Sequence, residues 1–252
     1  MIVPGMTPAE AANDARKDMV PLYNKVKPVF KSQERRHRTS RNRTDAFESL
    51  LQWRSPRGNN WIAVISTTKK ETTIAAHVWY RGNDDRLRAI RVDLLRTAVD
   101  VYYSAHMLER YCERFDPSRD PIQRLNDFLF ANHSVGMQYT KDLGEGKYEV
   151  LFGMLHGTCT GIADTQARLT TLTTFLDHGL LGADQQALSE LTDIQRYFNY
   201  LSKGQRAHVM RGIEAELVKE EARNGAPVKD KDKVLAVMMQ LAGLSPASSP
   251  AR

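Results

Sequence analysis

The sequence is poor in cysteine and contains no long apolar run. Cys112 and Cys159 are the only cysteines among 252 residues, which favours two buried, reduced thiols over a disulfide or a zinc site. No segment approaches the roughly 20 consecutive apolar residues that span a bilayer. The first residues also lack the basic start and apolar stretch of a secretory signal. We therefore expect a soluble, cytoplasmic protein that does not bind membranes.

The short motifs of several enzyme classes are absent as well. The sequence has no Gly-x-x-x-x-Gly-Lys-Ser/Thr phosphate loop, no Gly-x-Gly-x-x-Gly dinucleotide turn, no Gly-x-Ser-x-Gly elbow and no His-Glu-x-x-His pair. An Asp-rich two-metal nuclease site is also unsupported, because Asp84 and Asp85 fall in a predicted turn and Asp93 has no obvious partner. We therefore expect no cofactor.

The composition is compatible with an apolar core and an anionic partner. Forty-one per cent of the residues are hydrophobic, and the net charge of +6 with a pI near 9.3 favours an anionic ligand. Cations concentrate in one short segment that contains Arg35, Arg36, His37, Arg38, Arg41 and Arg43. This segment is either a solvated arm or exposed helix, or an arm that neutralises the phosphates of RNA.

Hydrophobic periodicity predicts an α+β protein with a central antiparallel sheet and flanking helices. Strands are predicted at residues 61–66, 72–80, 87–94, 148–155 and 168–176, with a hairpin loop at 82–85 and a possible strand at 156–164. The alternation in the second strand places His77 opposite the apolar face, toward solvent or a hydrogen-bond partner. Residues 1–55 are then N-terminal helices and the basic arm, 56–182 the core, 183–244 C-terminal helices and 245–252 a disordered tail.

Caps and prolines predict where the helices begin and end. Thr7-Pro8-Ala9-Glu10 is a helix start, and that helix should end by Val20 because Pro21 follows. Pro28 should interrupt residues 26–30, which we expect to be extended or a broken turn. Helical periods are then predicted at residues 45–53 and 121–132, and again along the C-terminal third.

The stretch VYYSAHMLERYCERF, residues 101–115, changes from a strand into a helix. Ser104 is the predicted N-cap. Leu108, Tyr111, Cys112 and Phe115 share one helix face, and the other face carries His106, Arg110, Glu113 and Arg114. Such a polar row can act on a phosphodiester, with imidazole moving a proton and guanidinium groups stabilising charge on phosphorus. Alternatively, it is an ordinary surface row in which the glutamates pair with neighbouring arginines.

Two other groups of polar residues remain open to interpretation. His156 and Cys159 have a ligand-like spacing, but a structural zinc site normally needs two such pairs, so we expect no metal site. The threonines at positions 170, 171, 173 and 174 have high strand propensity, and alternate members either face water or contact phosphates and sugars.

SAHMLERYCERF, followed by a helix, then YEVLFG and later LTTLTTFL, resembles the core of small RelE-like ribonuclease toxins. The resemblance covers residues 101–176. It implies a small antiparallel sheet with helices on one face and a basic cleft for RNA. The carried-over residues are His106, Arg110 and Arg114, with Thr173 or Thr174 as possible contacts. This chain is longer than such toxins, and three of its predicted strands precede the helix instead of following it.

These observations give two hypotheses for the function. In the first, the protein is an RNA-directed, metal-independent ribonuclease of the toxin type, in which His106 transfers the proton while Arg110 and Arg114 clamp the phosphate. The basic segment at residues 35–43 then adds nonspecific affinity. In the second, it is a noncatalytic nucleic-acid-binding or regulatory protein of phage or mobile-element origin that holds a protein partner through its C-terminal helices.

Overall fold

The computed structural model describes residues 1–39, 47–68, 72–93, 99–115, 120–133, 136–154, 156–177 and 203–224, together with Leu235. The chain separates into two compact units, Met1–Thr192 and Asp193–Arg252, and each is considered by itself. In the second unit, the described helix is α6 (Lys203–Asn224). No helix in the ranges above is long and apolar enough to cross a membrane.

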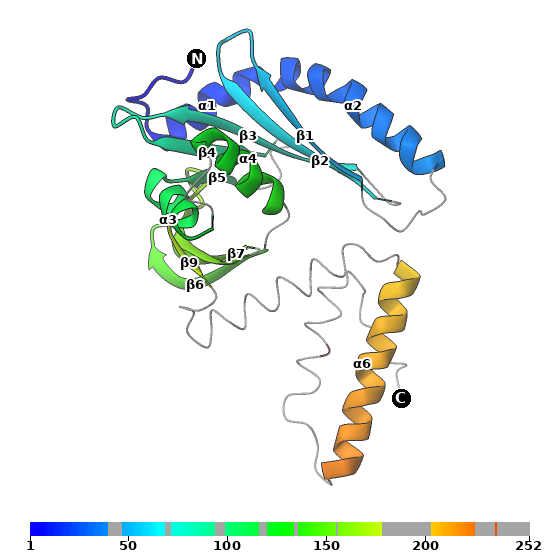
Figure 1. Ribbon diagram of the computed structural model, residues 1–252. Coiled ribbons are helices and arrows are strands. Elements are labelled where there is room, and N and C mark those ends of the chain that lie inside the picture. Colours follow the sequence, from blue (N-terminus) through cyan, green and yellow to red (C-terminus); the bar gives the residue numbers. More distant parts are fainter. Residues whose placement is uncertain are drawn as a thin grey trace. The chain divides into compact units, whose positions relative to one another are not determined.

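The first unit is built around a mixed sheet (Figure 1). Its described strands follow the order β1-β2-β3-β4-β5-β9-β8-β7-β6. Strands β1 to β5 form one antiparallel meander and β6 to β9 a second, and the parallel neighbours β5 and β9 join the two. The bounds are β1 Phe47–Arg54, β2 Asn60–Thr67, β3 Thr72–Arg81, β4 Leu87–Val92, β5 Asp100–Tyr103, β6 Gly136–Gly144, β7 Lys147–Met154, β8 Gly157–Asp164 and β9 Leu169–Asp177. The predicted α+β class and mainly antiparallel sheet are confirmed.

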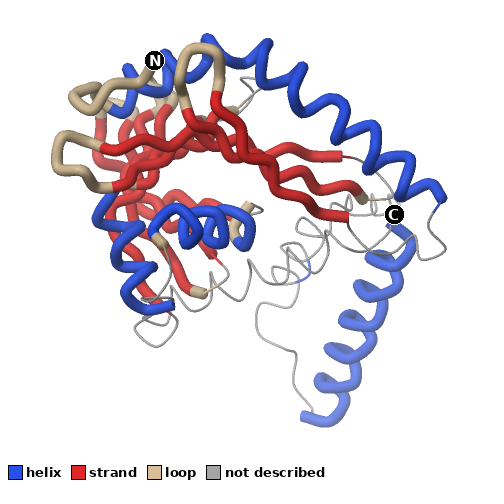
Figure 2. The backbone as a smooth tube through the Cα atoms, turned by 45° about the horizontal axis from the view of Figure 1, so that its top comes forward, coloured by secondary structure: helices blue, strands red, loops and turns tan. Residues whose placement is uncertain are grey.

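Helices cover both faces of this sheet. The helix α1 (Pro8–Ala15), the 3-10 turn η1 (Arg16–Asp18) and α2 (Met19–Thr39) lie over one face, and α3 (Ala105–Phe115) and α4 (Pro121–Ala131) lie on the other (Figure 1). Figure 2 shows the long α2 over the strands from a second direction. Two separate apolar clusters result, one beneath α1 and α2 and one beneath α3 and α4.

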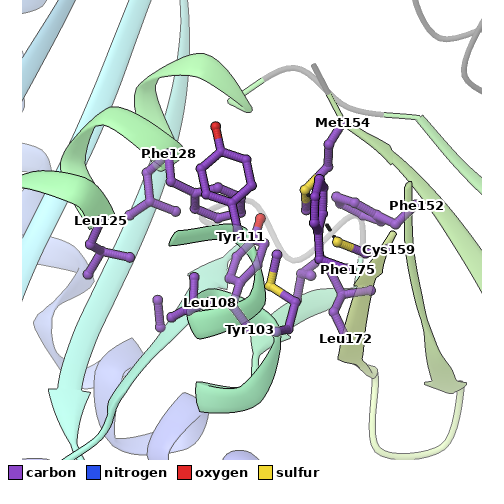
Figure 3. Packing of buried hydrophobic residues seen from close by; sticks show 14 of the residues in the cluster. Tyr103, Leu108, Tyr111, Leu125, Phe128, Phe152, Met154, Cys159, Leu172 and Phe175 are labelled. Carbon is purple, nitrogen blue, oxygen red and sulfur yellow. Dashed lines mark hydrogen bonds between the residues drawn. The ribbon is translucent and has the colours of Figure 1, made fainter. Parts of the chain in front are cut away.

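The cluster beneath α3 and α4 is rich in aromatic rings (Figure 3). Tyr111 packs edge to face against Phe128 and Phe175, with centroid separations of 4.7 and 5.2 Å. Tyr103 makes a similar contact with Phe128 at 5.6 Å. Such pairs stabilise a core beyond their buried area by about 1 kcal/mol each. This packing joins both helices to the centre of the sheet.

Local signals at several element ends are confirmed. Thr7 and Glu10 form the expected capping box at the start of α1. Ser104 Oγ accepts a 3.2 Å hydrogen bond from the backbone N–H of Met107 and so caps α3. The predicted hairpin between β3 and β4 is also present, with Asp85 in the left-handed region at φ 57°.

Two predictions on the N-terminal side are wrong. Residues 45–53, predicted as a helix, contain β1 from Phe47, which pairs with β2 along its whole length. The inter-strand hydrogen bonds and the apolar cover on both faces outweigh the helical period there.

Pro28 does not interrupt the chain and lies inside α2. A proline removes the hydrogen bond to the carbonyl four residues earlier, here that of Asn24. Because Asn24 and Pro28 both lie on the exposed side of α2, water can bind that carbonyl, and the helix continues.

Two further features escaped prediction. The edge strand β6 is almost entirely exposed and has no apolar alternation to reveal it. His77, expected to face solvent or a hydrogen-bond partner, is fully buried, and neither ring nitrogen completes a hydrogen bond within the described chain. Burial is the main cause that lowers the pKa of His77 to about 3, with the charge of Arg91 adding to it. The expectation failed because helices cover both faces of the sheet, so neither side of β3 is open.

Candidate functional site

The start of α3 is fixed to the centre of the sheet. Besides capping the helix, Ser104 donates its backbone N–H to the carbonyl of Leu172 on β9 at 3.1 Å. The helix follows β5 after this one residue. Met107, Leu108 and Tyr111 are buried, which confirms the predicted apolar face for Leu108 and Tyr111. The polar row is therefore held in a defined orientation.

The structure places His106, Arg110 and Arg114 on successive turns of α3, with carboxylates beside both arginines. Arg110 forms an ion pair with Glu113 at 3.6 Å, and Arg114 forms one with Asp177 at the end of β9. His106 is exposed. Among the described residues, no hydrogen bond or ion pair joins His106 to either arginine. The three side chains share a region of the helix but do not form a connected constellation.

These ion pairs reduce the positive potential that a phosphate would meet on α3. Exposed pairs contribute only about 0–1 kcal/mol, so an incoming phosphate can displace Glu113 from Arg110. Arg114 is more strongly held, because its side chain and that of Asp177 are only 27% and 29% exposed. A phosphate clamp made of both arginines would therefore require the Arg114 pair to open.

A pocket beside α3 lies along a different side of the helix. Its lining includes Ala105, Glu109 and Cys112 but none of the three predicted catalytic residues. Glu109, which the sequence suggested as a partner for neighbouring arginines, pairs across the pocket rim with Arg86 of the β3–β4 loop. The hollow and the His/Arg row are thus separate features.

A histidine and a tyrosine that sequence reasoning did not combine lie in contact. The Tyr111 hydroxyl and His156 Nδ1 are 2.7 Å apart. Burial raises the pKa of Tyr111 to about 12, so the hydroxyl stays protonated at neutral pH, and the tautomer of the ring decides which of the two groups donates. The residues are 45 positions apart, and no local pattern could have indicated their contact.

The metal alternative finds little support in this geometry. Cys159 is fully buried, and its Sγ lies 3.4 Å from the sulfur of Met154, inside the apolar cluster (Figure 3). His156 lies instead against Tyr111. Within the described ranges, no three His, Cys, Asp or Glu side chains gather closely enough to hold a metal ion.

The strongest concentration of charge is on α2. The helix carries six Lys and Arg side chains and one Glu, so it holds +5 of the net charge of +6 that the whole chain carries. All six cationic side chains are exposed, namely Lys25, Lys27, Lys31, Arg35, Arg36 and Arg38. The structure thus extends the predicted basic segment toward the N-terminus by three lysines, while Arg41 and Arg43 lie outside the described residues.

Four of these cations form a row. Lys27, Lys31, Arg35 and Arg38 are spaced by four, four and three residues, so they stay on one side of the helix. Their positions rise by about 6 Å per four residues and span about 17 Å. We refer to these four residues as the α2 cation row. The lysines were overlooked because Pro28 suggested a break in this segment, which removed the helical spacing.

The C-terminal part of α2 is anchored to the sheet. Gln33 donates to Ser49 Oγ at 2.7 Å and accepts from Thr67 Oγ1 at 3.0 Å. The ring of His37 is buried and packs edge to face on Phe47 at 5.7 Å. His37 is therefore part of the packing of α2 on β1, although the sequence suggested that it belonged to the basic arm. The exposed cations consequently project from a rigid support.

The other predicted contact residues have ordinary structural roles. The Thr173 hydroxyl donates to the carbonyl of Thr160 at 3.3 Å on the neighbouring strand. Thr170 is fully buried, whereas Thr173 is exposed. In the second unit, Val209, Ile213 and Leu217 of α6 are half-buried and Val218 is 51% exposed. A role for α6 in binding a protein partner stays a prediction.

Comparison with known proteins finds no matching protein-family model, and no significant match among curated proteins or solved structures. The functional argument therefore depends on the residues themselves.

Proposed function

We propose that this protein binds RNA without cleaving it, through the α2 cation row. The observation that carries the proposal is the placement of +5 of the chain's net charge on one helix. Phosphate contacts supply most of the sequence-independent affinity of nucleic-acid-binding proteins. Phosphates are spaced about 3.4 Å apart along one strand of a DNA duplex. At that spacing, a row about 17 Å long matches about five phosphates.

Part of the charge has a second, structural role. Arg36 and Arg38 occupy the last turn of α2, where cations interact favourably with the helix dipole. Arg36 also lies over the Phe47 ring at 5.0 Å. Lys27 and Lys31 lie in the middle of the helix, away from the dipole ends, and have no acidic partner among the described residues. Lys27 Nζ lies 5.8 Å from the centroid of the exposed Tyr23 ring, a contact at the surface of the helix itself. These lysines are the best test of the proposal.

The test compares two double variants that remove the same charge. Binding of a fluorescent, unstructured RNA is measured against salt concentration for the wild type, K27Q/K31Q and K141Q/K147Q. Lys141 and Lys147 are exposed on the β6–β7 hairpin, far from α2 in the sheet order. Loss of two phosphate contacts should lower the log–log salt slope by about 1.4 for single strands, while the hairpin variant keeps the wild-type slope.

The opposite results are equally informative. Equal losses in both variants would indicate binding by net charge alone, and an unchanged slope in K27Q/K31Q would reject the α2 cation row. A duplex DNA competitor of the same length establishes which polymer is preferred.

The toxin-type ribonuclease stays a second candidate, favoured by one observation. His106 is exposed, and Arg110 is one turn away, where its ion-pair partner within the described part of the chain is the exposed carboxylate of Glu113. Cleavage of labelled RNA by the wild type in EDTA, abolished by His106→Ala with RNA binding retained, would establish this activity. Binding without cleavage would leave the noncatalytic proposal in place.

A further inference from the structure

A pocket of about 200 Å³ lies between the β3–β4 hairpin, α3 and α4. From α3 it is lined by Ala105, Leu108, Glu109 and Cys112, which follow the i, i+3, i+4, i+7 spacing of one helix face. From α4 the same spacing runs from Pro121 to Phe128. Two regular helix faces thus point toward each other with space left between them.

The base of the pocket is apolar and aromatic. Leu108, Leu125 and Phe128 are buried with 5%, 2% and 1% exposure. Figure 3 shows them at the end of the aromatic cluster where α3 and α4 approach each other. An apolar base covered by an aromatic ring favours a flat, apolar group over a polar one.

The rim of the pocket is charged. Three arginines, Arg81, Arg86 and Arg124, line the pocket together with two carboxylates, Asp85 and Glu109. Arg86 is paired with Glu109. Arg81 meets Asp85 at 3.3 Å, but these side chains are 41% and 85% exposed. Arg81 Nη1 also donates to the backbone carbonyl of Asp85 at 2.7 Å, which holds the guanidinium group at the rim. The exposed side-chain pair is weak, so the carboxylate of a ligand can replace the Asp85 carboxylate on Arg81.

We propose that this pocket binds a small aromatic carboxylate. An apolar cavity of about 150 Å³ is large enough for benzene, so 200 Å³ accommodates one six-membered ring with a short acidic group. The ring lies over Leu125 and Phe128, and the carboxylate faces the arginine rim, where planar guanidinium groups bind carboxylates in bidentate geometry. The pocket and the α2 cation row lie on opposite faces of the sheet, so this proposal does not depend on RNA binding.

Cys112 provides a built-in reporter. Its thiol lines the pocket and is partly exposed. Cys159, the other cysteine, is fully buried, and burial raises the pKa of its thiol well above the usual value. Alkylation of the folded protein should therefore modify Cys112 and leave Cys159 intact. A ligand in the pocket should slow that reaction.

The experiment measures the iodoacetamide reaction of Cys112 by mass spectrometry with benzoate, phenylacetate or neutral benzamide present. For ligands of this size we expect a Kd on the order of 1 mM for the acids and at least tenfold weaker protection by benzamide. R81Q/R124Q should reduce protection by the acids to the benzamide level. The matched control is Arg88→Gln, because Arg88 pairs with Asp84 in the same hairpin outside the pocket.

Ligand-observed NMR with Cys112→Ser protein and thermal unfolding of every variant complete the design. NMR detects binding without the thiol, and unfolding shows that each variant is folded. No binding of either acid by NMR, equal protection by benzamide, or equal losses in Arg88→Gln and R81Q/R124Q would overturn the proposal.

Discussion

Replacing Glu48 with Gln is expected to destabilise the protein at acidic pH and to have little effect at alkaline pH. His133, which follows α4, lies between two acceptors. Its Nε2 is 3.2 Å from Glu48 Oε1 on β1, and its Nδ1 is 2.7 Å from the carbonyl of Phe130. Because a carboxylate and a carbonyl both accept, both ring nitrogens must donate, and this requires the protonated imidazole. A neutral ring can donate to only one of these two acceptors, so the connection between the end of α4 and the edge of the sheet is strongest while His133 is charged.

The sign of the pH dependence follows from the environment of His133. Burial lowers the pKa of His133, but the hydrogen bonds to Glu48 and to the Phe130 carbonyl outweigh it, so the pKa is raised overall. Of the other charged groups nearby, Arg91 opposes protonation, and His77 stays neutral because its pKa is about 3. The stabilisation is fully present below the unfolded pKa of about 6.5 and is lost as the pH rises through the folded pKa.

The expected loss of folding stability in Glu48→Gln is modest but measurable. The two side chains are only 13% and 21% exposed, and Gln keeps a neutral acceptor, so we expect a loss of about 1 kcal/mol. For a protein of this size, that corresponds to a Tm decrease of about 2–4 °C. Thermal unfolding of the wild type and Glu48→Gln from acidic to alkaline pH measures it. The matched control is Glu149→Gln on β7, where Glu149 is exposed. A difference that is constant with pH, or that grows toward alkaline pH, would refute the reasoning.

Two further predictions concern the N-terminal layer. Asp18 is fully buried and accepts hydrogen bonds from Asn59 Nδ2 at 2.8 Å and Trp61 Nε1 at 3.1 Å. Asp18→Ala should leave the Trp61 donor unsatisfied and Asn59 Nδ2 with its long 3.5 Å hydrogen bond to Asp14. The expected cost is about 3 kcal/mol, measured as a lower urea midpoint with an unchanged m-value. Pro28→Ala should restore the missing helix hydrogen bond and stabilise the protein by about 1–2 kcal/mol, and a lower Tm for this variant would show that the proline is better accommodated than we infer.

The fold was predictable where one segment carried its own pattern. The alternation of Ile74, Ala76, Val78 and Tyr80 identified β3 and its buried face, and Ser104 marked the start of α3. Hydrophobic periodicity did not identify strands whose formation depends on pairing with a neighbouring strand. Residues 47–54 become a strand through pairing with β2, and β6 is recognisable only by its partner β7.

The candidate site was less predictable because charge pairing is non-local. The spacing of Arg110 and Arg114 indicated a phosphate clamp. However, Arg114 pairs with a carboxylate 63 residues away in the sequence, and a helical period gives no information about so distant a contact. Conversely, the spacing that makes Lys27, Lys31 and Arg35 a row depends on α2 continuing through Pro28. The helix can continue there because water reaches the carbonyl of Asn24. Which carbonyls water reaches depends on which side of the helix the sheet covers, and the sequence of α2 alone does not show this.

The helices α2 and α3 therefore differ in what an anion would meet. On α3, each of the two arginines is paired with a carboxylate, so its charge is largely balanced locally. On α2, six cations face one glutamate, and the rest of the chain contributes only +1 to the net charge. At physiological salt, exposed charges are largely screened beyond a Debye length of about 8 Å. Within that distance, the unbalanced charge of α2 attracts a polyanion more strongly than the paired charges of α3 do. It should therefore approach the α2 face first, and rate constants for RNA association should fall with salt in the wild type more steeply than in K27Q/K31Q.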